Sequence, residues 1–166
     1  WSYFTTPTPG STNNTKSYDG IVKNKLTFEP LGGIFNNSVS VKITNTFGGV
    51  VRYTLNGSVP TASSPAVSGA ISLTSTGVIR ARIFKPGMIP GEVITNTYFI
   101  DPNNEIGKLP VVSIATDPGN FWDADSGIYV QDFKPEWEVP INIELFQNDG
   151  SDRAAFNLLA GTKING

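Results

Sequence analysis

Three aspartates in the second half of the chain have a spacing that could hold a metal ion. Asp117, Asp123 and Asp125 occur within nine residues, and alternate carboxylates converge on one ion in calcium-binding loops. Such a loop also needs a further acidic ligand several residues on, whereas residues 128–130 are apolar. We therefore favour a solvated turn in which Asp117 caps a short helix starting at Pro118, and we predict no metal site.

Three glutamates could supply the paired carboxylates of an acid–base site. They are Glu136, Glu138 and Glu144, and strand alternation would place the first two on one side, flanking Trp137. Hydrolysis of a glycosidic bond needs two carboxyl groups at a defined separation in a cleft, which makes this activity the weaker alternative. Charge that protects a strand edge from aggregation is the interpretation we favour, so we predict no catalytic residue.

The amino-acid inventory excludes several kinds of catalysis. The sequence contains no histidine and no cysteine, which rules out Ser-His-Asp and Cys-His nucleophiles, disulfides and the commonest zinc ligands. Residues 161–166, GTKING, lack the glycine-to-lysine spacing of a phosphate-binding loop, and GGIF at 32–35 lacks the partner glycines of a dinucleotide turn. We therefore predict no cofactor.

Trp122 and Trp137 are the residues that could contact a carbohydrate. Tryptophan rings can stack on sugars when they are exposed, and these two belong to an aromatic-rich segment of the chain. In a small unit such rings more often form the core. Both interpretations are open from the sequence.

Charge is distributed unevenly along the chain. The net charge is −2, with eight basic and three acidic residues in 1–100 but four basic and eleven acidic residues in 101–166. This asymmetry predicts two units that meet near residues 101–108. Arg80, Arg82 and Lys85 form the only visible basic cluster, and strand alternation is expected to point the arginines outward. Because phosphate binding needs a larger basic face, we predict no nucleic-acid partner. No apolar run reaches membrane-spanning length, and we predict no membrane insertion.

Short runs with a period of two dominate residues 26–100. Apolar and polar residues alternate at the spacing of half-buried strands, and glycine and proline separate the runs. The uncharged turn that begins at Asn56-Gly57 is expected to reverse the chain rather than to bind a ligand. We predict a β-sandwich built from six strands, at residues 26–28, 39–44, 50–55, 70–74, 77–84 and 93–100.

Residues 108–166 predict a smaller β-rich unit. Asp149-Gly150 supplies the positive backbone angles of a hairpin turn. At about sixty residues the unit would be marginally stable alone, and we interpret it as the start of a larger domain. Its strands are expected within residues 109–117, 127–130, 141–146 and 156–166.

Residues 27–100 resemble the chitobiase/beta-hexosaminidase C-terminal domain, also described as fibronectin type III associated. The ordered segments RYTLNGSVPT, SSPAVSGAISL and GVIRARIF carry the likeness. It implies an immunoglobulin/fibronectin III-like sandwich of a type that accompanies sugar hydrolases. Asn56 stands where the family usually has aspartate and Val59 where an acid is common, which makes a ligand at this turn less credible still.

Residues 109–166 resemble the opening of the spore coat protein H (CotH) kinase family. The segments LPVVSIATDPGNFWDADSGIYV, WEVPINIELFQNDGS and GTKING carry this likeness. In that family the nucleotide-handling and metal-binding residues lie beyond the stretch present here. The resemblance therefore implies a kinase-like parent protein and assigns no catalytic, cofactor or metal-binding position to this chain.

These patterns predict a mainly β chain: a fibronectin-like sandwich at 25–101, followed by a partial β-rich domain at 108–166. Residues 1–24 look like a linker or the exit of a lamin-tail-type domain. The resemblances imply a non-catalytic spacer of a secreted or cell-surface bacterial protein, whose partners are neighbouring domains of the same chain. The alternative is a carbohydrate-binding accessory module of a glycoside hydrolase, with carbohydrate as its partner.

Overall fold

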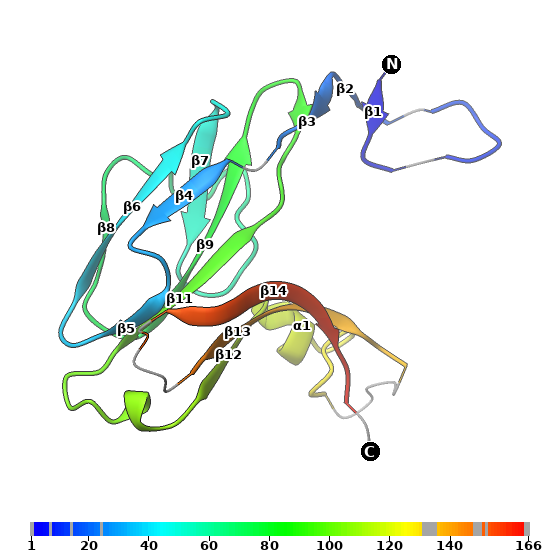
Figure 1. Cartoon of the computed structure of the whole chain (residues 1–166). Helices are drawn as coiled ribbons and strands as arrows, with labels where there is room; N and C mark the ends of the chain where they lie inside the picture. Colours follow the sequence, from blue (N-terminus) through cyan, green and yellow to red (C-terminus); the bar gives the residue numbers. More distant parts are fainter. Residues whose placement is uncertain are drawn as a thin grey trace.

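The chain folds mainly into β-strands, as the sequence predicts (Figure 1). The computed structural model describes residues 2–6, 8–13, 15–23, 25–130, 136–147, 151 and 153–164. Within these ranges the helices are the 3-10 turn η1 (Ile106–Lys108) and the α-helix α1 (Pro118–Trp122). Neither has the length and apolar character needed to cross a bilayer.

Two sheets form a β-sandwich over residues 26–100. One is four-stranded, in the order β5-β11-β9-β7, and the other is three-stranded, in the order β4-β6-β8. The pairs are antiparallel, apart from the parallel pair of β5 with β11. The strands are β4 (Leu26–Glu29), β5 (Gly33–Phe35), β6 (Val39–Asn45), β7 (Val50–Thr54), β8 (Ile71–Leu73), β9 (Gly77–Phe84) and β11 (Ile94–Ile100).

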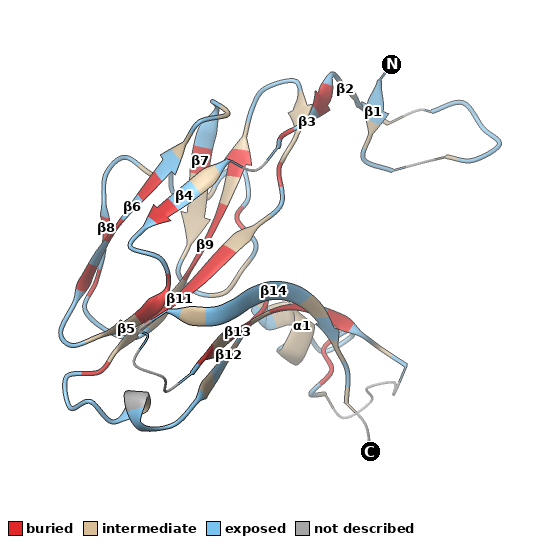
Figure 2. Ribbon diagram, viewed as in Figure 1, coloured by how far each residue is buried: buried red, intermediate tan, exposed pale blue. Residues whose placement is uncertain are grey.

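The inward-facing residues of both sheets form one hydrophobic core. Alternate residues along β6 and β9 point inward, so the period-two pattern becomes burial on one face of each sheet. Val41, Ile79, Ile83 and Tyr98 are completely inaccessible to solvent. Figure 2 marks buried segments of this core in red along β9 and β11.

A third sheet, of order β12-β13-β14, packs beside the sandwich (Figure 1). It comprises β12 (Val111–Ala115), β13 (Val139–Phe146) and β14 (Ala154–Thr162), all antiparallel. We call it the C-terminal sheet. The tight turn predicted at Asp149-Gly150, between β13 and β14, lies outside the described residues. β14 is drawn mainly as exposed in Figure 2.

Short strands complete the fold near the N-terminus. β1 (Tyr3–Phe4) pairs with β2 (Ser17–Tyr18), and β3 (Gly20–Ile21) pairs in parallel with β10 (Met88–Ile89). The first pair lies away from the sandwich (Figure 1). The contact between β3 and β10 joins the N-terminal segment to the loop that leads into β11.

Several sequence-based assignments of strands need correction, and β1, β2, β3 and β10 lie in segments where the sequence predicts no strand. Residues 127–130 were expected to form a strand but form a turn, because the amide of Ile128 donates to Asn120 O at 3.1 Å and that of Tyr129 to Phe121 O at 2.9 Å. These amides thus pair with carbonyl groups at the end of α1, and not with a neighbouring strand. Conversely, β5 was not expected, since a Gly-Gly pair precedes it and its partner β11 lies far along the chain.

Candidate functional site

The contact between the C-terminal sheet and the sandwich centres on a buried carboxylate, Glu144. Its side chain is 1% exposed. Oε1 accepts hydrogen bonds from the backbone N–H of Thr97 at 3.3 Å and from Nδ2 of Asn157 at 3.0 Å, and Oε2 accepts one from the Thr97 hydroxyl. The Thr97 hydroxyl also pairs with that of Ser113 at 2.7 Å. We call these four residues the interface network.

Strand register explains why these polar groups meet. Ser113, Glu144 and Asn157 lie side by side on three adjacent strands of the C-terminal sheet. Residues in cross-strand register on one face point the same way, and this face is the one packed against β11. A polar row therefore fills the boundary between the two sheets.

Burial raises the pKa of Glu144 above its ordinary value, and the two hydrogen bonds from Thr97 oppose that rise. Glu144 also raises the pKa of Tyr98, for which burial is the larger cause. A buried carboxylate with this many donors acts first as an acceptor that orders its neighbours. The function that the network supports best is fixing one sheet against the other.

A second contact joins the uncharged turn of the sandwich to α1. Asp117 Oδ1 accepts from the Gly119 amide, as predicted for a helix cap, and Oδ2 accepts from the Val59 amide at 3.0 Å. Gly57 has a φ of +84°, which confirms the predicted left-handed turn, and a Cβ there would lie 2.8 Å from Thr116 O. The turn thus packs against the start of α1.

Arg80 does not point into solvent, which corrects the expectation from strand alternation. The side chain is 7% exposed, and its guanidinium donates to Gly57 O. Burial lowers the pKa of Arg80, while the nearby Asp117 acts in the opposite direction. Arg82 is half-buried and donates to Gly91 O. Both arginines therefore hold turns in place.

The aspartates after α1 form a turn, in agreement with the interpretation favoured from the sequence. Asp123 Oδ1 accepts hydrogen bonds from the amides of Asp125 and Ser126 and from the Ser126 hydroxyl. The Ser126 hydroxyl is the main reason why the pKa of Asp123 is lowered. Among the described residues, no three acidic side chains gather into a metal-binding cluster.

The two tryptophans named as carbohydrate contacts lie in different surroundings. Trp122 is 66% exposed and stacks on Tyr129, with ring centroids 5.2 Å apart. Phe121 meets Tyr129 edge to face at 5.4 Å. Trp137 is half-buried. Trp122 is therefore available to a ligand, and its ring does not belong to a core.

Trp122 borders a cleft of about 500 Å³ between the sandwich and the C-terminal sheet, which we call the aromatic cleft. Its lining carries hydroxyl, amide, aliphatic and aromatic groups and no charged side chain. Trp137 does not line it. The lining residues are Leu55, Asn56, Gly57, Thr76, Gly77, Val78, Thr97, Phe99, Ser113, Ile114, Ala115, Thr116, Pro118, Phe121 and Trp122.

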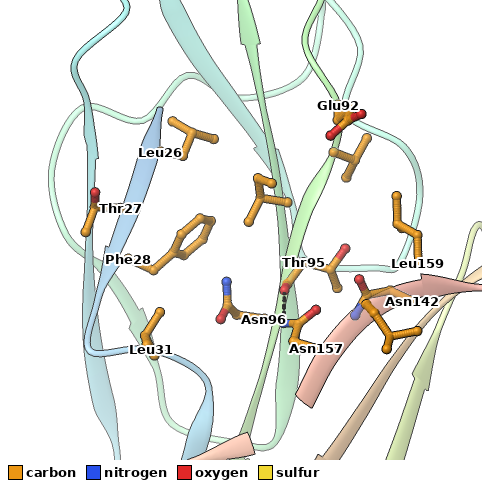
Figure 3. A pocket seen from close by; sticks show the side chains of 13 residues that line it. Leu26, Thr27, Phe28, Leu31, Glu92, Thr95, Asn96, Asn142, Asn157 and Leu159 are labelled. Atoms are coloured by element: carbon orange, nitrogen blue, oxygen red, sulfur yellow. Dashed lines mark hydrogen bonds between the residues drawn. The ribbon is translucent and has the colours of Figure 1, made fainter. Parts of the chain in front are cut away.

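A second cleft, of about 400 Å³, lies where β4, β11 and β14 approach one another (Figure 3). We call it the edge cleft. Sequence reasoning missed it, because its three borders come from segments far apart in the chain and no local pattern links them. It is lined by Leu26, Thr27, Phe28, Leu31, Glu92, Val93, Ile94, Thr95, Asn96, Asn142, Asn157, Leu158 and Leu159.

Comparison with known families identifies part of the sandwich. The family model of the chitobiase/beta-hexosaminidase C-terminal domain matches residues 30–95. The matched domain is a non-catalytic accessory domain, and the match confirms the resemblance of this region. No curated protein and no solved structure matches the chain. The match ends before β12, so the likeness of residues 109–166 to CotH kinases stays a prediction.

Proposed function

We propose that this chain is a non-catalytic spacer of a secreted or cell-surface, multidomain bacterial protein, in which it holds neighbouring domains of the same polypeptide at a fixed distance. Three units are proposed: a linker at 1–24, the sandwich at 25–101 and a β-rich unit at 108–166. The family match supports the accessory role, and domains of the matched type are typically extracellular.

The interface network is the observation that carries this proposal. A spacer must transmit position, which requires that its parts do not move independently. Hydrogen bonds between buried groups are directional, so the bonds of Glu144 to Thr97 define one relative placement of the two sheets. The bond from Val59 to Asp117 adds a second anchor at another point of the boundary.

The opposite face of the C-terminal sheet supports the proposal that residues 108–166 belong to a larger, CotH kinase-like domain. This outer apolar face consists of two cross-strand rows. Sheet faces of such composition are normally covered by a further layer, yet Val112 and Ile114 are each 53% exposed. The rows are Val112, Leu145 and Phe156, and Ile114, Ile143 and Leu158.

Titration calorimetry with ATP and magnesium tests the non-catalytic assignment. We expect no saturable heat from residues 1–166, because the resemblance assigns none of the family's nucleotide-handling positions to this chain. A dissociation constant in the micromolar range or tighter would contradict the assignment. Heat from the longer parent protein, alongside none from residues 1–166, would support a kinase-like parent.

Substitution of Ile114 by threonine tests the larger domain. In residues 1–166 the free energy of unfolding is expected to change by less than about 0.5 kcal/mol, since the side chain is half exposed. In a longer parent protein with a covering layer, the same change should cost about 1–3 kcal/mol. Equal small losses in both proteins would show that the outer apolar face stays uncovered.

The aromatic cleft supports a second candidate, a carbohydrate-binding accessory module. An exposed ring beside hydroxyl and amide groups, in a lining without charged side chains, suits a neutral sugar. Trp122 would supply the stacking surface. Trp137, which lies outside this cleft, would contact only a ligand that extends beyond it.

A glycan array followed by titration of Trp122→Ala tests this candidate. If the ring stacks on a sugar, its loss should weaken binding by roughly 1–3 kcal/mol without lowering the melting temperature. Leu109→Ala is the matched control, because Leu109 is 73% exposed and does not line the aromatic cleft. A silent array, or equal losses in both variants, would remove the candidate.

A further inference from the structure

The edge cleft is bordered by the backbones of strands as well as by side chains. Its lining contains unbroken runs of residues at 26–28, 92–96 and 157–159. Successive residues of a strand point to opposite faces, so a run without gaps means that the edge of the strand lines the cleft. β4 and β14 are the outermost strands of their sheets, and such edges offer unpaired N–H and C=O groups.

β14 is unusually suited to pairing with a further strand. Natural edge strands often carry charged residues or proline, which prevent a further strand from pairing with them. The nine residues of β14, AAFNLLAGT, contain neither. Leu158 and Leu159 are 47% and 60% exposed. A long, uncharged and apolar edge of this kind is a template for an extended segment.

Two buried polar atoms beside this edge are without a partner among the described residues. They are Oγ1 of Thr95 and Nδ2 of Asn142, in side chains 2% and 4% exposed. Both residues line the edge cleft (Figure 3), where Asn157 Nδ2 already donates to Thr95 O at 2.7 Å. Buried polar groups are nearly always paired, so these two atoms point to a ligand that brings hydrogen-bonding groups.

The chemistry of the lining favours a peptide over a sugar. Asparagine and threonine side chains match the alternating donors and acceptors of a peptide backbone, and Leu26, Leu31 and Leu159 can receive aliphatic side chains. The aromatic residue of the lining, Phe28, is 3% exposed, so no ring is presented for stacking on a sugar. Glu92 is the one charged residue of the lining.

We propose that the edge cleft binds an extended, uncharged peptide segment, which adds to the outer edge of β14 as a further strand. Its aliphatic side chains contact Leu26, Leu31 and Leu159, and a small polar side chain reaches Thr95 and Asn142. The volume of about 400 Å³ lies within the ~300–1,000 Å³ typical of small-ligand sites and suits a few residues of such a strand. This mode of recognition takes its affinity from main-chain hydrogen bonds.

A capped hexapeptide of alternating threonine and valine is a suitable probe. Titrated into residues 1–166, it should shift the amide NMR signals of residues 26–28, 94–96 and 157–159 saturably. The matched control is the same peptide with alternate amides N-methylated, which cannot donate to a strand edge. It should bind at least about tenfold more weakly, a difference that is expected when several main-chain bonds are lost.

Leu159→Arg adds a charged side chain at the mouth of the edge cleft and should also weaken peptide binding by about tenfold. Leu109→Arg, at an exposed leucine outside the cleft, should leave it unchanged. Should Leu159→Arg disturb the dispersion of the spectrum, Thr27→Arg replaces it, because Thr27 is exposed and lines the same cleft.

Four outcomes would overturn the proposal. These are no shifts at millimolar peptide, equal binding of the N-methylated peptide, and shifts in the cleft from a neutral trisaccharide but not from the peptide. The fourth is concentration-dependent dimerisation that broadens the β14 signals without any peptide, which would assign the edge to a second copy of the chain.

Discussion

Glu144 is buried, whereas an ordinary glutamate is exposed to water. Removing a carboxylate from water disfavours its charged form, and the donors from Thr97 and Asn157 recover only part of that cost. The Glu144 side chain therefore orders the boundary between the sheets, and the free-energy cost of burying it is larger when the carboxylate is charged.

We expect Glu144→Gln to become more stable relative to the wild type as pH rises. The folded state raises the pKa of Glu144, so folding favours the protonated form and stability is lost once pH climbs above the ordinary value of 4.5 and through the raised one. Glutamine does not titrate, and its amide can donate to the Thr97 hydroxyl while that hydroxyl donates to Ser113. Denaturant unfolding at a series of pH values between 4 and 8 measures the difference.

Glu138→Gln is the control for this experiment, because Glu138 is an exposed carboxylate just before β13. Its effect should be small at every pH. Glu144→Ala should instead cost about 1–3 kcal/mol, since it leaves the Thr97 amide unpaired. A constant difference between Glu144→Gln and the wild type across the series would contradict the assigned role.

At the scale of elements, the turn from Asn56 to Ser64 combines local hydrogen bonds with packing against a distant part of the chain. Its polar side chains bond within the turn, as Asn56 does with Ser58 and Ser64 with Thr61. Its backbone also meets the C-terminal part of the chain at Gly57 and Val59. A local pattern thus determines the bend, and packing against α1 gives it a second role.

Gly57→Ala should destabilise the fold more than Gly48→Ala. Both glycines have a φ near +85°, at +84° and +87°, which costs an alanine about 1–2 kcal/mol. The Cβ at Gly57 would also meet Thr116 O at 2.8 Å, whereas at Gly48 nothing lies within 4 Å. The two free energies of unfolding, measured in urea, separate backbone strain from contact with the second unit. Equal losses of stability in the two variants would mean that the contact of Gly57 with Thr116 contributes nothing.

For the whole molecule, we expect the sandwich and the C-terminal sheet to unfold in one calorimetric transition. Within the interface network, the buried side chains of Glu144 and Thr97 join them, and coupled parts of this size normally melt together. The calorimetric enthalpy should then equal the van't Hoff enthalpy. Two separate transitions in the wild type would refute a rigid spacer. Two transitions that appear only in Glu144→Ala would show that the interface network couples the unfolding of the two parts.

Much of the sandwich could be predicted from the sequence. The six expected strands correspond to β4, β6, β7, β8, β9 and β11 within one or two residues at each end, because alternation between core and solvent is a local property. The cap at Asp117 and the positive φ at Gly57 are also confirmed, since the chemistry of caps and turns depends on adjacent residues.

The interfaces could be decided only by the tertiary structure. Asn157 bonds to Thr95 across 62 positions and Thr97 to Glu144 across 47, and β5 finds its partner 65 residues later. The same alternation that places a side chain on one face of a strand does not say whether water or another sheet lies there. The sequence therefore predicts surface charges at Arg80 and Glu144, which are buried, and it gives no sign of the edge cleft, which forms where three segments far apart in the chain come together.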